Sequence, residues 1–264
     1  MEVSNMSRVI HKRSKSKATE KPPVKEKFIE RETIDSQVIP KFSPANDNQN
    51  IAVRMLRAGK SVVVLRGSAG VGKSLIAAWW AATQLKEKKT EKIWLLRPAV
   101  STGKSIGLLK GTEEEKLLPY FIQTITHLEN FMGSGFLSYC LEKKKIEMKA
   151  VEYLRGYSFE DCIVIVEESQ NFTREDMEMV LTRLGKNATI ILTGDEKQHD
   201  LRGVSGLEQT VQLIEHTLAD EPDYMKDEDL DAIENKFGVV TFTPDDVMRS
   251  GLTRAFVKMY YNTK

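Results

Sequence analysis

Cysteine, long apolar runs and net charge are all scarce in this sequence. Only two of its 264 residues are cysteines, Cys140 and Cys162, and their separation matches no metal-binding spacing, which excludes a disulfide-stapled scaffold and fits a reducing compartment. Runs of β-branched residues and leucine, such as those at 62–65 and 163–166, are far shorter than the roughly 20 residues that cross a bilayer. The amino terminus lacks the apolar core of a signal peptide. We therefore expect a cytoplasmic protein without a membrane-spanning helix.

The charges nearly cancel, with 39 basic against 38 acidic residues and a formal net charge of +1. No global excess of positive charge favours nucleic acid or an anionic membrane, so any such site must be a local patch. A hydrophobic fraction of 41% is typical of a globular protein. At roughly 150 residues per domain, the length predicts one large domain with appendages.

The first 41 residues differ in composition from the rest of the chain. They contain few large apolar side chains and carry eight lysines or arginines between positions 8 and 27, so they cannot bury enough surface to fold alone. We interpret residues 1–41 as a flexible basic tail, and an electrostatic arm for nucleic acid or another partner is the alternative. The folded domain is expected to occupy residues 42–264.

Beyond the tail, short β-branched segments alternate with amphipathic helical stretches. The expected strands are residues 61–66, 92–97, 161–166, 188–193 and 238–242. This alternation predicts βαβ units and therefore an α/β fold of three layers, in which helices flank both faces of a mainly parallel sheet.

Two insertions interrupt this series. The first, residues 98–155, contains a polar loop at 101–105, a predicted helix at 114–130, and a lysine-rich segment at 143–149 that is expected to form a hairpin or helix. The second, residues 215–234, holds nine acidic residues and one lysine. A cation cage and a solvated acidic surface are the two interpretations. The spacing differs from that of a calcium-binding loop and favours the surface.

A glycine-rich motif lies between the first expected strand and a predicted helix at 75–85. It matches the pattern Gly-x-x-x-x-Gly-Lys-Ser/Thr at every position: Gly67, Ser68, Ala69, Gly70, Val71, Gly72, Lys73 and Ser74. In such a loop, glycines let backbone N–H groups converge on the phosphates of a nucleotide. Lys73 is expected to bridge the β- and γ-phosphates, and Ser74 to bind Mg²⁺. An ordinary glycine-rich turn is the alternative.

A carboxylate pair follows the expected strand at 161–166. We assign Glu167 to Mg²⁺ and Glu168 to polarisation of the attacking water, and a solvent-exposed strand end is the alternative. The next strand ends at Thr193, and Asp195 and Gln198 follow it. All three are expected to face the γ-phosphate. This order suits the nucleotide hydrolases in which an extra strand lies between the glycine-loop strand and the strand of the acids.

Further motifs occur in order between about Asn46 and Tyr260. They are Arg97-Pro98-Ala99-Val100, Gly107-Leu108-Leu109, Gly111, Glu115-Lys116, Pro119-Tyr120, Arg155-Gly156, Glu168-Ser169-Gln170-Asn171, Leu181-Thr182-Arg183-Leu184-Gly185, Thr193-Gly194-Asp195, Gln198, Asp200-Leu201, Ser205-Gly206-Leu207 and Asp246-Val247-Met248-Arg249. With these motifs the chain resembles the PhoH-like ATPases. The resemblance implies a single RecA-like P-loop domain related to the first motor domain of superfamily 1 helicases. It further implies ATP binding and hydrolysis, association with RNA in some members, and ring oligomers.

The resemblance extends to individual residues and includes one departure. Gln49, beside Asn48, resembles the glutamine with which those helicases read adenine, and a polar residue at a helix start is the alternative. Where the family usually has Asp-Glu-Ala-Gln, this chain begins the motif with Glu167. Its carboxylate can still accept from a Mg²⁺-bound water, but the extra methylene could slow hydrolysis, because small misplacements are costly. Glu167→Asp is therefore expected to leave activity intact or raise it.

P-loop enzymes also gain rate from an arginine placed against the transferring phosphate, in the same chain or from a neighbouring subunit. Arg249, in the motif just after the fifth expected strand, is the first candidate. Arg183 is the second. Either could instead be a surface ion-pair residue.

Together these features favour a Mg²⁺-dependent ATPase that couples hydrolysis to binding or remodelling of RNA or single-stranded nucleic acid. In the first insertion, Arg97, Lys104, Lys110 and Lys116 could follow a phosphate backbone or form a solvated rim. A slowly hydrolysing, nucleotide-gated interaction module is the alternative, and a P-loop kinase is disfavoured because we find no arginine-rich lid. Unwinding by one motor domain would require an oligomer, so we expect a homo-oligomer, with a hexameric ring as one form.

Overall fold

The computed structural model describes three stretches of the chain: residues 39–98, 113–198 and 203–263. The chain divides into two units, residues 1–36 and 37–264, and the described residues belong to the second. Most of the predicted tail lies outside the described residues. So do the predicted polar loop at 101–105, with Lys104, and Lys110.

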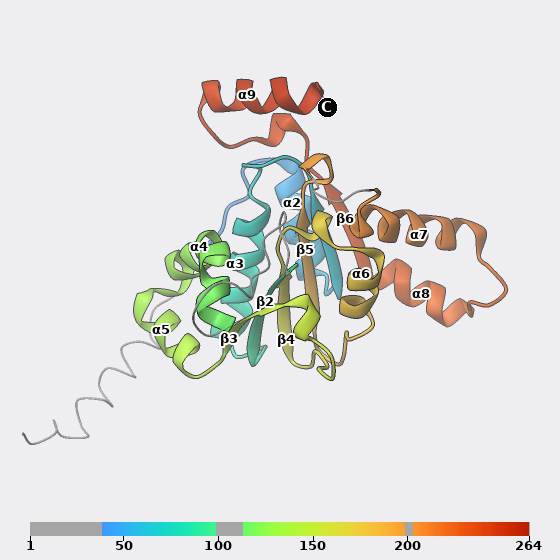
Figure 1. The fold of residues 1–264 in the computed structure, drawn as a ribbon, viewed down its shortest axis with the longest axis horizontal. Helices are drawn as coiled ribbons and strands as arrows, with labels where there is room; N and C mark the ends of the chain where they lie inside the picture. The colour runs from blue at the N-terminus through green and yellow to red at the C-terminus, as the bar shows by residue number, and fades with distance from the viewer. Residues whose placement is uncertain (1–38, 99–112, 199–202, 264) are drawn as a thin grey trace, which may run out of the picture. The chain divides into compact units, whose positions relative to one another are not determined.

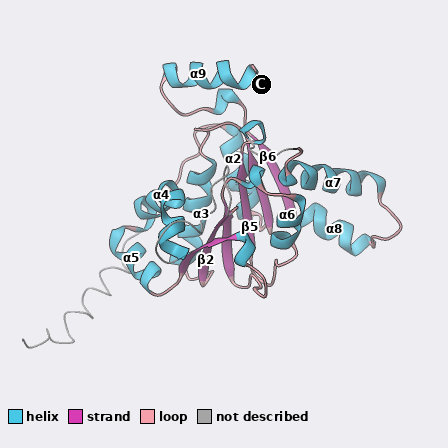
Figure 2. Ribbon diagram, in the orientation of Figure 1, coloured by secondary structure: helices cyan, strands magenta, loops and turns pink. Residues whose placement is uncertain are grey.

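A six-stranded parallel sheet forms the centre of the described unit (Figures 1 and 2). Its strands are β1 (Val62–Arg66), β2 (Lys92–Arg97), β3 (Ile146–Ala150), β4 (Cys162–Val166), β5 (Thr189–Gly194) and β6 (Phe237–Thr241). They are arranged in the order β3-β2-β4-β5-β1-β6, and every neighbouring pair is parallel. The predicted α/β fold with a mainly parallel sheet is therefore confirmed. The extra strand that was expected between the strand before the glycine loop and the strand before the acidic pair is β5, which lies between β1 and β4.

Helices cover both faces of this sheet (Figure 1). The helices of the described stretches are α2 (Asp47–Arg57), α3 (Lys73–Lys86), α4 (Glu113–Met132), α5 (Ser134–Glu142), α6 (Arg174–Leu181), α7 (Gly206–Asp220), α8 (Asp227–Lys236) and α9 (Gly251–Asn262), with the 3-10 turns η2 (Val151–Tyr153), η3 (Ser169–Asn171), η4 (Glu196–Gln198) and η5 (Pro244–Asp246) between them. Of these, α9 lies beyond the end of the sheet and covers neither face (Figure 1). One hydrophobic cluster joins α2, α3, α4 and α5 to one face, and a second joins α6 and α7 to the other. Successive strand residues alternate between the clusters, as Val63 and Val64 do.

The register of the sheet brings the ends of three strands together. Arg66 at the end of β1 pairs with Gly194 on β5, and Val166 at the end of β4 pairs with Leu192 on β5. Because the strands are parallel, the segments that follow them leave the sheet at the same edge. In open parallel sheets this carboxyl edge is where ligands bind.

The prediction of a hairpin or helix at residues 143–149 is wrong. This region contains β3, an edge strand parallel to β2. Ile146 and Met148 are buried, whereas Glu147 faces the other way and forms an ion pair with Lys92 of β2. The lysines that precede the strand concealed this alternation, and its pairing partner is remote in sequence.

The acidic insertion at 215–234 forms the end of α7 and most of α8, and α8 buries none of its side chains. Across residues 39–98, 113–198 and 203–263, no group of three or more His, Cys, Asp or Glu could hold a metal ion. The helix predicted at 114–130 is present as α4. No helix in those stretches has the length and hydropathy needed to cross a membrane.

Candidate functional site

The glycine loop connects β1 to α3 and passes close to two other segments. Gly67 has a φ of +141°, and a Cβ at this position would lie 2.5 Å from the carbonyl oxygen of Phe242. Gly72 has a φ of +93°, and its Cβ would lie 2.7 Å from Nε2 of Gln49. Both positions therefore require glycine. Gly72 is also the N-cap of α3 and provides no capping side chain, so the first N–H groups of the helix can serve an anion.

Lys73, the first residue of α3, folds back over this loop. Its Nζ donates to the carbonyl oxygens of Gly67 at 2.6 Å and Ser68 at 2.9 Å. Burial lowers the pKa of Lys73, and the nearby carboxylates of Asp195, Glu167 and Glu168 oppose that shift. The loop thus holds a half-buried amine among acidic groups, and a bound phosphate chain would lie beside that amine.

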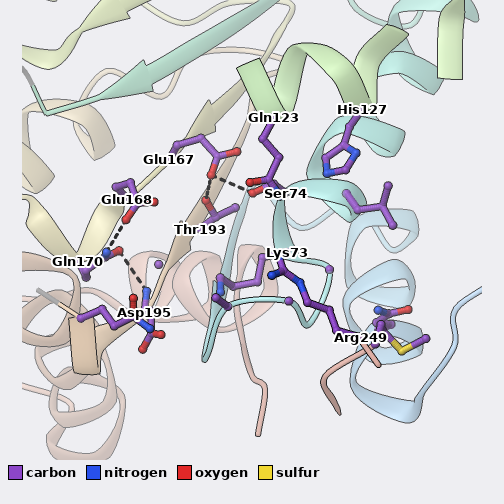
Figure 3. Close-up of a pocket in the computed structure, with 18 residues that line it drawn as sticks. Lys73, Ser74, Gln123, His127, Glu167, Glu168, Gln170, Thr193, Asp195 and Arg249 are labelled. Carbon is purple, nitrogen blue, oxygen red and sulfur yellow. Dashed lines mark hydrogen bonds between the residues drawn. The ribbon is translucent and has the colours of Figure 1, made fainter. Parts of the chain in front are cut away.

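Glu167, which directly follows β4, accepts hydroxyl hydrogen bonds from three different elements, and Figure 3 shows the bonds from Ser74 and Thr193. Its Oε2 accepts from Ser74 of α3 at 3.0 Å and from Thr193 of β5 at 2.6 Å. Its Oε1 accepts from Thr124 of α4 at 2.7 Å. Glu167 itself is only 9% exposed to solvent. Hydroxyl and carboxylate oxygens are the ligands that Mg²⁺ prefers, so Ser74 and Glu167 fit that ion.

Glu168, the residue after Glu167, has an unusual backbone conformation. Its φ of 54° and ψ of 38° are left-handed, a conformation that non-glycine residues adopt mainly where surrounding structure enforces it. Its Oε2 accepts from Nε2 of Gln170 at 2.6 Å, and Oε1 of Gln170 accepts from the backbone N–H of Asp195 at 3.1 Å. Gln170 therefore connects Glu168 to the end of β5 (Figure 3).

A cavity of about 340 Å³ joins these groups, which is within the size range of small-molecule sites. It brings together predicted residues from six segments of the chain: Gln49, Ala69, Gly70, Gly72, Lys73, Ser74, Glu167, Glu168, Thr193, Asp195, Gln198 and Arg249. Gly67, Ser68 and Val71 belong to the same loop without lining this cavity. Arg183 does not line it either.

Gln49 is buried beneath the glycine loop. Its Oε1 accepts from the N–H of Ala45 and its Nε2 donates to the carbonyl oxygen of Val71, both at 2.9 Å. The side chain thus attaches the start of α2 to the loop, and contact with a base would use the second N–H of Nε2 or the second lone pair of Oε1. Asn48 points elsewhere, because its Nδ2 donates to Oδ2 of Asp246 at 2.8 Å.

Arg249 reaches the cavity from its own chain (Figure 3). The N–H of the preceding residue, Met248, donates to the carbonyl oxygen of Gly70 at 3.1 Å. A Cβ on Gly70 would lie 3.1 Å from Nε of Arg249. The segment after β6 therefore packs directly on the glycine loop and carries the guanidinium with it.

Arg183 lies at the opposite end of the sheet. Its Nη1 donates to the carbonyl oxygen of Tyr157 at 2.9 Å, and its own carbonyl accepts from the N–H of Phe159. Phe159 precedes β4, whereas Glu167 follows it. Five strand residues, about 17 Å, separate these two ends. Arg183 could therefore approach a phosphate only in another copy of the chain.

Sequence reasoning missed the contribution of α4. Gln123 and His127 of this helix line the cavity, one helical turn apart, and Thr124 binds Glu167 (Figure 3 labels the first two). Burial lowers the pKa of His127 and so favours its neutral form, although the carboxylate of Glu167 opposes the shift. The available signal was Thr124 itself, a polar residue in an apolar stripe. The buried stripe consists of Leu117, Phe121, Leu128 and Met132.

A glycine loop before an uncapped helix, with acidic residues at the ends of neighbouring parallel strands, defines a P-loop nucleotide-binding fold. A family model described as PhoH-like protein matches residues 41–261. The chain belongs to the PhoH-like protein family.

The similar proteins include protein PhoH of Escherichia coli K12, 35% identical over 205 residues, which are 76% of this chain and 53% of that protein. A PhoH-like protein of Mycobacterium tuberculosis H37Rv is 33% identical over 219 residues, 82% of this chain and 57% of that protein. A PhoH-like protein of Bacillus subtilis 168 is 39% identical over 150 residues, 56% of this chain and 47% of that protein. The chain spans about half the length of these relatives.

Proposed function

We propose that this chain binds ATP together with Mg²⁺ and hydrolyses it. The observation that carries this proposal is the convergence of Lys73, Ser74, Glu167 and Glu168 on one cavity at the carboxyl edge of a parallel sheet. Family membership supports it as well. Adenine as the base rests on the resemblance to ATPases and on the position of Gln49 at the cavity.

In this proposal the glycine loop binds the triphosphate through the N–H groups at the start of α3, and Lys73 neutralises the β- and γ-oxygens. Ser74 and Glu167 would hold Mg²⁺, which when bound supplies positive charge to the phosphate oxygens. This assignment uses one carboxylate and one hydroxyl, so phosphate oxygens and water would complete the coordination of the ion.

Glu168 is assigned as the base that takes a proton from the attacking water. Its carboxylate is oriented by Gln170, and the same amide fixes the N–H of Asp195 at the end of the neighbouring strand. Asp195, Gln198 and Thr193 are proposed to sense the γ-phosphate from that side. Arg249, on the other side of the loop, is proposed to stabilise negative charge on the leaving phosphate.

RNA or single-stranded DNA is the proposed partner whose binding is coupled to hydrolysis. Of the basic residues assigned to it, Arg97 is largely engaged with its own chain. Its Nη1 donates to the carbonyl oxygen of Tyr120 at 3.3 Å, and its guanidinium lies 4.4 Å from the centre of that ring. Lys116 is half-buried on α4. A homo-oligomer, such as a hexameric ring, is proposed as the assembly in which Arg183 could reach a neighbouring site.

The test is ATP turnover by the full chain without polymer, with single-stranded RNA and with single-stranded DNA, with the oligomeric mass measured in parallel. We expect Mg²⁺-dependent turnover that a polymer stimulates. Lys73→Ala should abolish nucleotide binding or turnover while the protein keeps its melting behaviour. Unchanged turnover in folded Lys73→Ala would reject the site. Tight ATP binding with slow turnover, unaffected by any polymer, would instead favour a nucleotide-gated interaction module.

A further inference from the structure

Both carboxylate oxygens of Glu167 accept hydrogen bonds, and the donor to Oε1 lies on α4, outside the glycine loop, α3 and β5. Oε2 accepts from Ser74 and Thr193, and Oε1 accepts from Thr124. A glutamate has one more rotatable bond than an aspartate, and a buried carboxylate is costly unless its oxygens are hydrogen-bonded. A donor on Oε1 therefore limits the freedom that the longer side chain introduces.

Thr124 is well suited to this task because it cannot move independently of the core. It is 2% exposed and lies in the apolar stripe of α4, between Phe121 and Leu128, which are fully buried. That stripe belongs to the same hydrophobic cluster as α3, the helix that carries Ser74. The two hydroxyls that face Glu167 from the helical layer are thus fixed relative to each other.

We propose that Thr124 is a positioning residue that adapts this site to a glutamate, holding Oε1 so that Oε2 is presented beside Ser74 to the magnesium ion. The inference rests on the proposed function of the site. It also changes the expectation drawn from sequence for Glu167→Asp. A shorter side chain would withdraw from Thr124, so this substitution should weaken Mg²⁺ binding.

The experiment is an equilibrium titration of a fluorescent ATP analogue on the full chain at increasing Mg²⁺ concentration. Thr124→Val keeps the shape of the side chain and removes its hydroxyl. We expect it to raise the half-saturating Mg²⁺ concentration about 10-fold, the usual effect of removing an outer partner of a metal ligand. Thr124→Ser retains a hydroxyl and should restore the wild-type value. Thr126→Val is the matched control, since Thr126 is exposed on the same helix and its hydroxyl donates to the Ile122 carbonyl.

A double-mutant cycle with Glu167→Asp separates positioning from packing. If Thr124 acts through Oε1, the valine substitution should have little further effect in the Glu167→Asp background. Equal effects in both backgrounds, or a Thr124→Val protein with lower thermal stability but an unchanged Mg²⁺ requirement, would overturn the inference. A wild-type chain that shows no Mg²⁺-dependent nucleotide binding would instead reject the proposed function itself.

Discussion

Gln170 holds the carboxylate of Glu168 with a hydrogen bond of 2.6 Å from Nε2 to Oε2. The same amide accepts from the N–H of Asp195, so the proposed base and the end of β5 are linked through one side chain. Since Glu168 has a left-handed backbone, its side chain leaves the strand end in a direction that no regular strand residue would take. The orientation of the base thus depends on its neighbours.

Replacing the proposed base, Glu168, should separate nucleotide binding from hydrolysis. Glu168→Gln keeps the size of the side chain but cannot take a proton, so we expect nucleotide affinity to be retained and hydrolysis to fall by about 10² or more. Equilibrium binding and single-turnover hydrolysis measured on the same preparation would check this. An equal loss of binding and hydrolysis would move the base to another residue.

Removing Gln170, which orients Glu168, should also lower hydrolysis more than binding, but by a smaller factor. Gln170→Ala deletes a hydrogen bond to a charged group, a change of about 1.5 kcal/mol, so we expect turnover to fall about 10-fold. Nucleotide affinity should stay near the wild-type value. In the Glu168→Gln background the same substitution should have little effect on the residual rate. A full effect in that background would show that Gln170 acts independently of Glu168.

Arg249 should act in its own chain, because it lines the cavity beside Gly70. We expect Arg249→Ala to lower turnover, and mixing this variant with Lys73→Ala should not restore activity. Arg183 differs from Arg249, because it lies at the opposite end of the sheet from the cavity. An oligomer that uses it would regain activity when Arg183→Ala is mixed with Lys73→Ala. Restoration with Arg249→Ala would contradict the placement within one chain.

The start of the chain should divide into a dispensable and a required part. Deleting residues 1–36 is expected to leave thermal stability and basal ATP turnover unchanged, and to flatten the salt dependence of nucleic-acid binding if the tail is an electrostatic arm. Extending the deletion through residue 42 removes Ile39 and Phe42, which pack against the core, and the Phe42 ring lies 5.1 Å from that of Trp79. This second deletion should lower the free energy of unfolding by about 2 kcal/mol, as denaturant titration would measure. Equal stability of both truncated chains would contradict the packing.

The two thiols should be inert in the folded protein. Burial raises the pKa of Cys140 to about 11 and that of Cys162 to about 12, from an ordinary value of 9.0. A thiol reagent at pH 8.5 should therefore label neither residue until denaturant is added. Above pH 9 the unfolded chain releases thiol protons that the folded chain retains, so stability should fall as pH rises toward 11. Cys140→Ala should make that fall shallower, and rapid labelling of the folded protein would contradict the burial.

The site residues that can be predicted from the sequence are those that belong to short, contiguous motifs. Lys73 and Ser74 follow a fixed glycine spacing, and Glu167 and Asp195 each follow an apolar strand, so parallel pairing alone is enough to bring them together. Thr124 and Gln170 could not be assigned in this way. The contact of Thr124 with Glu167 depends on how α4 packs on α3, and the two bonds of Gln170 depend on a turn with a left-handed residue. The strand β3 was missed because its pairing lies across an insertion.

The glycine loop is closed by segments from both ends of the described unit. Gln49 binds it from before β1, and Phe242 and Met248 contact it from beyond β6. During synthesis the loop residues leave the ribosome long before residues 242–249, so the nascent chain carries an incomplete candidate site while most of the sheet is being made. The site is therefore completed by contacts of high sequence separation, which form late and slowly. A ribosome-bound chain stalled before β6 would contain the entire motif and still lack the structure that gives it its shape.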